Sequence, residues 1–196
     1  MQRPLELLRL QVLYQTEAQR FSEAQNKTGM ACPPTCGKCC QVPTVEASVF
    51  EMLPMAYTLV EKGLAESVLD KIKTSQTDLC VMFEPSSSDP AQGRCGQYQD
   101  RPMVCRIFAV GSRIDKYQQA EAIICRELKT LYPSQAQECQ GQAQQLPLMT
   151  EAFQRLAEID PRSLHERLRI SLALGTALEK VLYLSQLVDG QRTENT

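Results

Sequence analysis

The sequence predicts a mostly α-helical protein in which irregular, cysteine-rich loops and one small β-hairpin lie between the helices. Apolar residues recur at helical spacing near both ends of the chain. Nine cysteines occur in 196 residues, and eight of them fall between Cys32 and Cys125. The hydrophobic fraction of 43% is sufficient for a buried core. Together these features favour helices arranged around a cysteine-rich centre.

The first part of the chain is expected to form three helices. Residues 5–28 carry leucine and valine at helical spacing, and Gly29 ends the pattern. Thr44 suits the N-cap of a second helix, which Pro54 should kink. A short helix over residues 64–72 follows, with its apolar side chains on one face.

The segment 80–110 is the one part of the chain that predicts β structure. Two short runs, 80–83 and 94–98, flank a loop rich in serine, proline and glycine, which indicates a small hairpin. Pro102 then suits the first position of a short helix that carries Cys105.

Beyond the hairpin the pattern is again helical, and prolines separate the expected elements. Ser163 suits the N-cap of the last helix. We expect helices over residues 115–131, 134–144, 149–157 and 163–188.

Composition and charge exclude several classes of function. The net charge is −2 and there is no long basic run, so nucleic acid is not an expected partner. No apolar stretch approaches the roughly 20 residues of a membrane-spanning helix, so membrane insertion is not expected. Charged residues interrupt the apolar residues of the first ten positions, unlike a secretory signal. We therefore expect a cytoplasmic protein.

The cysteines are the strongest signal in the sequence. In a reducing compartment, clustered cysteines serve metal binding or redox chemistry more often than structural disulfides. Cys32, Cys36, Cys39 and Cys40 fall within nine residues, and thiolates so close together repel one another unless a cation neutralises them. Gly37 and the neighbouring prolines allow the backbone to wrap the sulfurs around one point. Both zinc and iron–sulfur clusters accept such spacings.

Further cysteines extend the candidate ligand set, which we take to be Cys32, Cys36, Cys39, Cys40, Cys80, Cys95, Cys105 and Cys125. The sequence does not indicate which four of these cysteines share a metal. It also leaves open whether there are one or two metal sites. Adjacent side chains diverge, so Cys39 and Cys40 need not point to the same metal. Cys139 lies in a Gln-rich stretch and is interpreted as a spectator. His165, the single histidine, is interpreted as a helix residue and not as a ligand.

The order of these residues resembles the YkgJ-type cysteine-cluster family, whose members are candidate zinc- or iron-chelating proteins with the signature CxxCxxCC. The resemblance rests on C-x3-C-x2-C-C from Cys32, then Cys80, Cys95 and the run Arg101-Pro102-x-x-Cys105-Arg106. One departure is the three-residue gap after Cys32, where the signature has two. The resemblance implies metal binding. A similar cysteine module occurs in flagellin lysine N-methylases, which have an iron–sulfur centre, and this favours an iron–sulfur cluster over zinc.

Two arginines beside the cysteines are candidate cofactor-binding residues. Arg101 and Arg106 flank Cys105 and would offset the negative charge of thiolates or of a cluster. The alternative for Arg101 is an ordinary surface pair with Asp100 or Glu84.

Three functional hypotheses remain open at this stage. The first is an iron–sulfur protein with a redox, sensing or assembly role. The second is a structural zinc module that binds a protein partner. The third is a cluster-dependent enzyme, either related to the methylases or similar to radical S-adenosylmethionine enzymes, whose cluster loop matches Cys32-x3-Cys36-x2-Cys39. The sequence leaves open whether the protein is an enzyme.

The expected organisation follows from these assignments. We expect an N-terminal helix, a cysteine-cluster metal-binding domain, a C-terminal helical region packed on it, and a disordered tail. Their bounds are residues 1–30, 31–131, 132–188 and 189–196, respectively.

Overall fold

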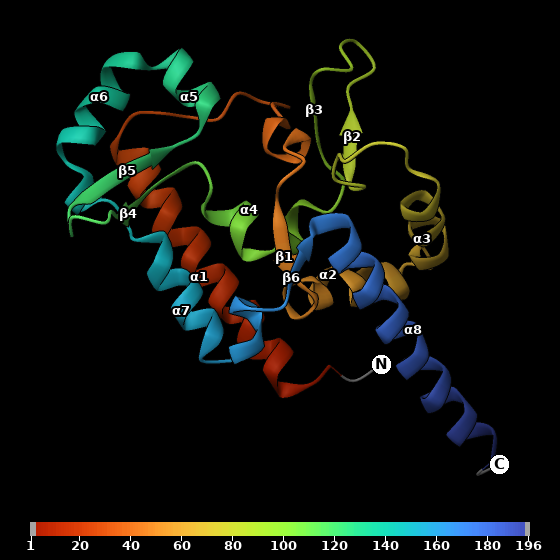
Figure 1. Cartoon of the computed structure of the whole chain (residues 1–196). Coiled ribbons are helices and arrows are strands. Elements are labelled where there is room, and N and C mark those ends of the chain that lie inside the picture. Colours follow the sequence, from red (N-terminus) through yellow and green to blue (C-terminus); the bar gives the residue numbers. More distant parts are fainter. Residues whose placement is uncertain (1–2, 195–196) are drawn as a thin grey trace.

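The protein is mostly helical, and the predicted fold class is confirmed (Figure 1). The computed structural model describes residues 3–194, with side chains described to residue 187. The helices are α1 (Leu5–Lys27), α2 (Val49–Glu61), α3 (Ala65–Thr74), α4 (Met103–Ile107), α5 (Arg126–Leu131), α6 (Pro133–Gly141), α7 (Met149–Ala157) and α8 (Ile170–Glu194). Within the described residues, no helix is both long and apolar enough to cross a lipid bilayer.

The strands form three separate antiparallel pairs. One pair is a long-range contact that joins the start of α2 to the start of α8, and the other two are hairpins. The pairs are β1 (Glu46–Ser48) with β6 (Arg167–Arg169), β2 (Phe83–Pro85) with β3 (Gly93–Cys95), and β4 (Val110–Ile114) with β5 (Ala120–Ile124).

The β2–β3 hairpin lies within the expected segment, but the helix expected over residues 115–131 was wrong. Most of that segment belongs to the β4–β5 hairpin, and only its last six residues form α5. A tight turn explains the difference, because Asp115 Oδ1 accepts hydrogen bonds from the backbone N–H groups of Tyr117 (2.8 Å) and Gln119 (2.9 Å). Gln118 adopts a left-handed backbone with φ of 63°, which ends any helix. As a consequence, Cys125 is the N-cap of α5 and does not lie inside a helix.

Two further helix boundaries differ from the sequence prediction. Helix α2 begins after Ser48 and not after Thr44, because Ser48 and Glu51 form a reciprocal capping box. The last helix begins at Ile170, since Ser163 lies in a 3-10 turn and residues 167–169 pair with β1. Helix α8 continues to Glu194, so it includes most of the expected disordered tail; residues 195–196 lie outside the described residues.

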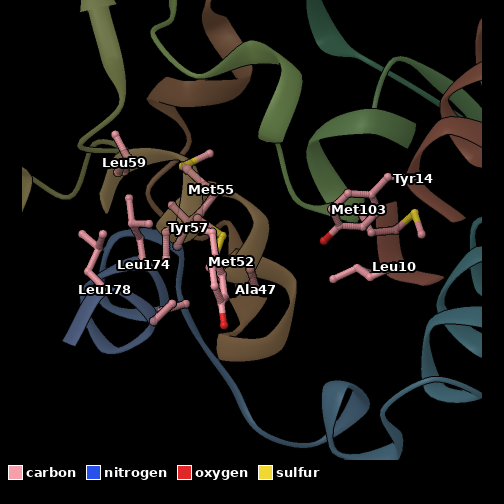
Figure 2. Packing of buried hydrophobic residues seen from close by; sticks show 14 of the residues in the cluster. Leu10, Tyr14, Ala47, Met52, Met55, Tyr57, Leu59, Met103, Leu174 and Leu178 are labelled. Atoms are coloured by element: carbon pink, nitrogen blue, oxygen red, sulfur yellow. The ribbon is translucent and has the colours of Figure 1, made fainter. Parts of the chain in front are cut away.

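The main core lies where α2 and α8 pack together, and α1 adds a second layer through α4 and α7. Figure 2 shows Met52 and Met55 of α2 close to Leu174 of α8, and Tyr14 of α1 beside Met103 of α4. All of these side chains are almost completely buried. A smaller core under β4–β5 contains Cys139, which is buried among apolar residues.

The segment between α1 and β1 carries the cysteine motif and is held by two backbone contacts. The amide of Gly93 donates to the carbonyl of Thr35 (2.9 Å), and the amide of Cys80 donates to the carbonyl of Cys40 (3.1 Å). These bonds fix the motif against the β2–β3 hairpin and the residues that precede it. The cysteine motif is thereby brought to the same region of the fold as Cys80 and Cys95, which lie far along the sequence.

Candidate metal centre

Eight of the nine cysteines line one cavity of about 700 Å³. They are the eight candidate ligands, Cys32, Cys36, Cys39, Cys40, Cys80, Cys95, Cys105 and Cys125. Cys139 is not among the residues that line it, and His165 is exposed elsewhere. All nine thiols are free. The structure therefore gathers the candidate ligands and leaves Cys139 and His165 outside the cavity. His165 follows the 3-10 turn Pro161–Leu164, so its expected place in the last helix was wrong.

Four thiols form an inner group, Cys39, Cys40, Cys80 and Cys95, centred on Cys40. Cys39 and Cys40 occupy a 3-10 turn that follows Gly37, whose φ of 55° supplies the left-handed residue the turn requires. Cys80 is held by the backbone bond to Cys40, and Cys95 ends strand β3 opposite Phe83. Local turns and one hairpin thus place four sulfurs from three segments together.

Hydrogen bonding within the inner group polarises its thiols. Hydrogen bonding with Cys40 lowers the pKa of Cys39 to about 6 and that of Cys95 to about 7. The same interaction lowers the pKa of Cys80. The pKa of Cys40 is instead raised, because its thiol is hydrogen-bonded to Cys39, Cys80 and Cys95. The pKa values of three of the four sulfurs are therefore lowered toward the thiolate form, which is the form that binds metals.

A glycine contact holds the cysteine motif against the hairpin. A Cβ on Gly93 would lie 2.2 Å from the carbonyl oxygen of Glu84 and 2.6 Å from the ring of Phe83. A Cβ on Gly37 would lie 2.6 Å from the carbonyl oxygen of Gly93. Only glycine fits at these two positions, so the close approach of the two segments depends on them.

Cys105 lies beside the inner group on helix α4. Burial raises its pKa, and the charges of Cys80 and Cys39 raise it further. Pro102 is the N-cap of α4 and accepts a backbone hydrogen bond from the Cys105 amide (3.1 Å). The sequence prediction of a short helix carrying Cys105 is confirmed.

Three other thiols, Cys32, Cys36 and Cys125, form an outer group. The side-chain amide of Gln25, at the end of α1, donates to Cys32 Sγ at 3.8 Å. Cys36 closes a turn with Pro33, and Cys125 donates its amide to Ala109 (2.9 Å). Burial raises the pKa of Cys32, and the charges of Cys125, Cys36 and Cys39 raise it further.

The charge of Arg101 acts on the inner group, whereas the guanidinium of Arg106 is hydrogen-bonded to backbone carbonyls. The Arg101 guanidinium lies 3.4 Å above the centre of the Tyr98 ring, and its Nε donates to the Tyr98 carbonyl (2.9 Å). After the Cys40 hydrogen bond, the charge of Arg101 contributes to the lowered pKa of Cys39 and of Cys95. Arg106 donates to the carbonyls of Arg101 and Gln99. The pairing of Arg101 with Glu84 does not occur, because Arg94 forms that salt bridge.

The cavity also contains residues that no sequence motif indicated. Gln25 of α1, Met52 and Met55 of α2, and Ile170 of α8 all line it. The only sequence signal for these residues is ordinary helical periodicity, which does not say what a helix faces. Lys38, in contrast, is directed to the carbonyl of Ala91 (2.9 Å).

The donor set fits a thiophilic metal or an iron–sulfur cluster. The cavity offers cysteine sulfur in excess and one nearby arginine to offset negative charge. Within residues 3–194, no three Cys, His, Asp or Glu side chains are arranged to hold a metal ion as they stand. Binding would therefore require the thiols to move toward the metal.

Comparison with known proteins agrees with this chemistry. Residues 31–126 match the model of the CxxCxxCC family, which is described as a candidate zinc- or iron-chelating domain. The matched range contains all eight cysteines of the cavity and excludes Cys139. No curated protein and no solved structure matches the chain.

Proposed function

We propose that the cavity holds an iron–sulfur cluster that serves a redox, sensing or assembly role, because residues 31–126 match the CxxCxxCC family model, which is described as a candidate zinc- or iron-chelating domain. The observation that carries the proposal is the convergence of eight cysteines on one cavity. Cysteine thiolates are the usual ligands of iron–sulfur clusters, and four of them suffice for one cluster. The inner group supplies four sulfurs, with Cys105 beside them.

The donor set favours a cluster, because the cavity offers cysteine sulfur in excess of the four ligands that one zinc ion takes, and cysteine thiolates are the usual cluster ligands. A cluster adds several iron and sulfide atoms to the same ligands. When bound, it would supply one-electron redox chemistry.

The residues of the chain would perform two tasks toward the cluster. The inner thiols would bind it. Cys39, with a pKa of about 6, is mostly thiolate at neutral pH, and Cys95, with a pKa of about 7, is about half thiolate. Arg101 would offset the net negative charge and raise the reduction potential.

The first test is the composition of protein purified without oxygen. We expect iron and acid-labile sulfide at near-stoichiometric levels, with charge-transfer absorbance in the visible range. Cys40→Ser should lose both, whereas Cys139→Ser, which changes a thiol outside the cavity, should keep both. A colourless native preparation that lacks iron and sulfide would contradict the proposal.

A structural zinc module for protein–protein interaction is the second candidate. Residues 28–45 contain little regular structure beyond one 3-10 turn, and a four-thiolate zinc ion would hold such a segment rigidly. Two results would favour a zinc module. Purified protein would contain one zinc ion per chain and no iron, and removal of zinc by a chelator would unfold residues 28–45 locally.

An enzyme of the radical S-adenosylmethionine type is not supported by the fold. Such enzymes are built from repeated βα units with a parallel sheet. In the part of the chain that the structure describes, every sheet has two antiparallel strands.

A further inference from the structure

We propose that the cavity lined by the eight cysteines also binds a small organic anion, a carboxylate with an apolar body, whose charged head is anchored by Arg101 and whose body packs against the main core. The inference goes beyond the proposed function. It concerns the charged and apolar residues of the cavity, and it does not depend on which metal the thiols bind.

The first support is the charge of the cavity lining. Within the described residues no Asp or Glu lines the cavity, whereas four cationic side chains do, namely Lys38, Arg94, Arg101 and Arg106. The whole chain has 23 acidic and 21 basic residues, so this one-sided lining is not a consequence of composition. A cleft lined by one sign of charge concentrates ions of the opposite sign, which here are anions.

The second support is the hydrogen bonding of these cations. Among the four, Arg94 forms a salt bridge, to Glu84 (3.1 Å). Arg101 donates from Nε to the carbonyl of Tyr98 (2.9 Å), and none of the described residues accepts from its Nη1 or Nη2. Two parallel N–H groups of one guanidinium can bind both oxygens of a carboxylate, which is the strong, bidentate form of this interaction. Arg101 is therefore able to anchor a carboxylate.

The anchor is also held in place before any ligand binds. The Arg101 guanidinium is stacked 3.4 Å above the centre of the Tyr98 ring, and the Arg101 carbonyl accepts a hydrogen bond from Arg106 Nε (2.7 Å). A planar guanidinium fixed by stacking loses little freedom when it forms further hydrogen bonds. Such pre-organisation lowers the entropic cost of binding.

The third support is the apolar part of the lining. Phe21 of α1, Met52 and Met55 of α2, and Ile170 of α8 line the cavity, and all four are buried members of the main core. The four cations, in contrast, are exposed or half-buried. The cavity therefore has a charged mouth and an apolar floor, which matches a ligand with a charged head and an apolar body. Its volume of about 700 Å³ lies within the range of roughly 300–1,000 Å³ that is typical of small-molecule sites.

The first test varies the ligand and leaves the protein unchanged. Octanoate is titrated into the native full chain, purified without oxygen, and binding is measured by calorimetry. We expect one equivalent to bind, with octanamide at least tenfold weaker because it lacks the charge, and octylamine not binding because it carries the charge of the cavity. Butyrate should also bind at least tenfold more weakly, since each buried methylene contributes up to about fourfold in affinity.

Several results of this series would overturn the proposal. Absence of octanoate binding would mean that the cations serve only to offset thiolate charge. Octanamide or octylamine binding as tightly as octanoate would show that the charge of the lining does not select the ligand. Butyrate binding as tightly as octanoate would show that the apolar floor is not used.

The second test changes the anchor. Arg101→Gln should weaken octanoate binding at least tenfold and leave octanamide binding unchanged, whereas Arg101→Lys, which keeps the charge but not the planar fork, should lie between. The matched control is Arg113→Gln, because Arg113 forms an exposed salt bridge with Glu121 (2.8 Å) and does not line the cavity. Equal octanoate affinity in Arg101→Gln and the native chain would contradict the assignment.

Two further measurements make the outcomes distinct. Circular dichroism establishes that each variant is folded, and if Arg101→Gln does not fold, the ligand series on the native chain still decides. Iron and sulfide are determined on every sample. A native chain that lacks both and binds octanoate would refute the cluster and support the anion site, whereas a cluster-loaded chain that does not bind octanoate would do the reverse.

Discussion

Solvent exposure and ionisation make opposite predictions for the relative reactivity of two thiols of the cavity, Cys32 and Cys39. Cys32 is exposed, but burial of its sulfur and nearby thiolates raise its pKa. Cys39 is less exposed, but hydrogen bonding with Cys40 lowers its pKa to about 6. Since the thiolate is the nucleophile, ionisation should decide reactivity near neutral pH.

We therefore predict the order of alkylation in the reduced, metal-free chain at pH 7. Cys39 should react with iodoacetamide first and Cys95, with a pKa of about 7, second. Cys32, Cys40 and Cys105 should react last, because their pKa values are raised. Peptide mass spectrometry after short reaction times gives the order. Faster labelling of Cys32 than of Cys39 would show that exposure dominates.

Arg101 offers a second test at the level of single residues. Arg101→Gln removes a positive charge that contributes to the lowered pKa of Cys39 and Cys95, so both pKa values should rise. Protons then compete better with metal, and affinity at pH 7 should fall by up to about tenfold for each pKa unit. The pH midpoint of Co²⁺ binding should move upward.

The matched control for Arg101 is Arg94→Gln. Arg94 also lines the cavity, but its guanidinium forms an exposed salt bridge with Glu84 (3.1 Å) and is not among the main causes of the lowered pKa of Cys39 or Cys95. An equal shift of the binding midpoint in both variants would mean that Arg101 has no specific role.

Among the elements, the contact between the cysteine motif and the β2–β3 hairpin should be intolerant of any side chain. Gly93→Ala places a Cβ 2.2 Å from a backbone oxygen, which cannot move without displacing strand β2. We expect a loss of about 1–3 kcal/mol in unfolding free energy, as is typical of overpacking, together with weaker metal binding. Urea unfolding and Co²⁺ titration measure the two effects.

Gly141→Ala is the control for this substitution. Gly141 lies at the end of α6, and a Cβ there would have no neighbour within 4 Å. The unfolding free energy of the Gly141→Ala variant should be unchanged or slightly increased. Equal effects of the two substitutions would show that the contact at Gly93 is not special.

Helices and strands were predictable from the sequence where a single local pattern, such as regular apolar spacing, determined the structure. Helices α1 and α7 match their expected ranges closely, because their apolar periodicity is regular and glycine or proline marks the boundaries. The β4–β5 hairpin was missed because its turn at Asp115 carries neither glycine nor proline. The start of α2 was misplaced because Thr44 and Ser48 are both suitable caps, and only Ser48 completes the box with Glu51.

The candidate site was predictable in its residue types and not in its arrangement. Short spacing grouped the four cysteines from Cys32 to Cys40, and the family resemblance added the later ones. Their arrangement around one cavity depends on long-range contacts, such as the backbone bond from the Cys80 amide to the Cys40 carbonyl. Local sequence does not encode such contacts, and the ligand role of each cysteine stays a prediction.

At the scale of the whole molecule, a buried ion pair joins the cysteine-bearing half of the chain to the C-terminal helices. Glu51 of α2 is completely buried, and its Oε2 accepts hydrogen bonds from Arg167 Nη1 (2.9 Å) and from the Ser48 amide (2.8 Å). Arg167 also donates to the carbonyl of Glu46 (2.7 Å), beside the β1–β6 pair. Burial raises the pKa of Glu51, and the charge of Arg167 opposes that rise.

We predict that Arg167→Met destabilises the fold by on the order of 3 kcal/mol at pH 7, because it leaves a buried carboxylate without its cation. The loss should depend on pH. Without Arg167, the pKa of folded Glu51 rises further above its unfolded value, so the penalty is absent below the unfolded pKa and grows as pH rises toward the folded pKa. Urea unfolding at pH 4.5 and pH 7 should therefore show a smaller difference from the native chain at the lower pH. Adding Glu51→Gln should recover part of the stability at pH 7 and remove the pH dependence, and a double variant no better than the single one would refute the electrostatic explanation.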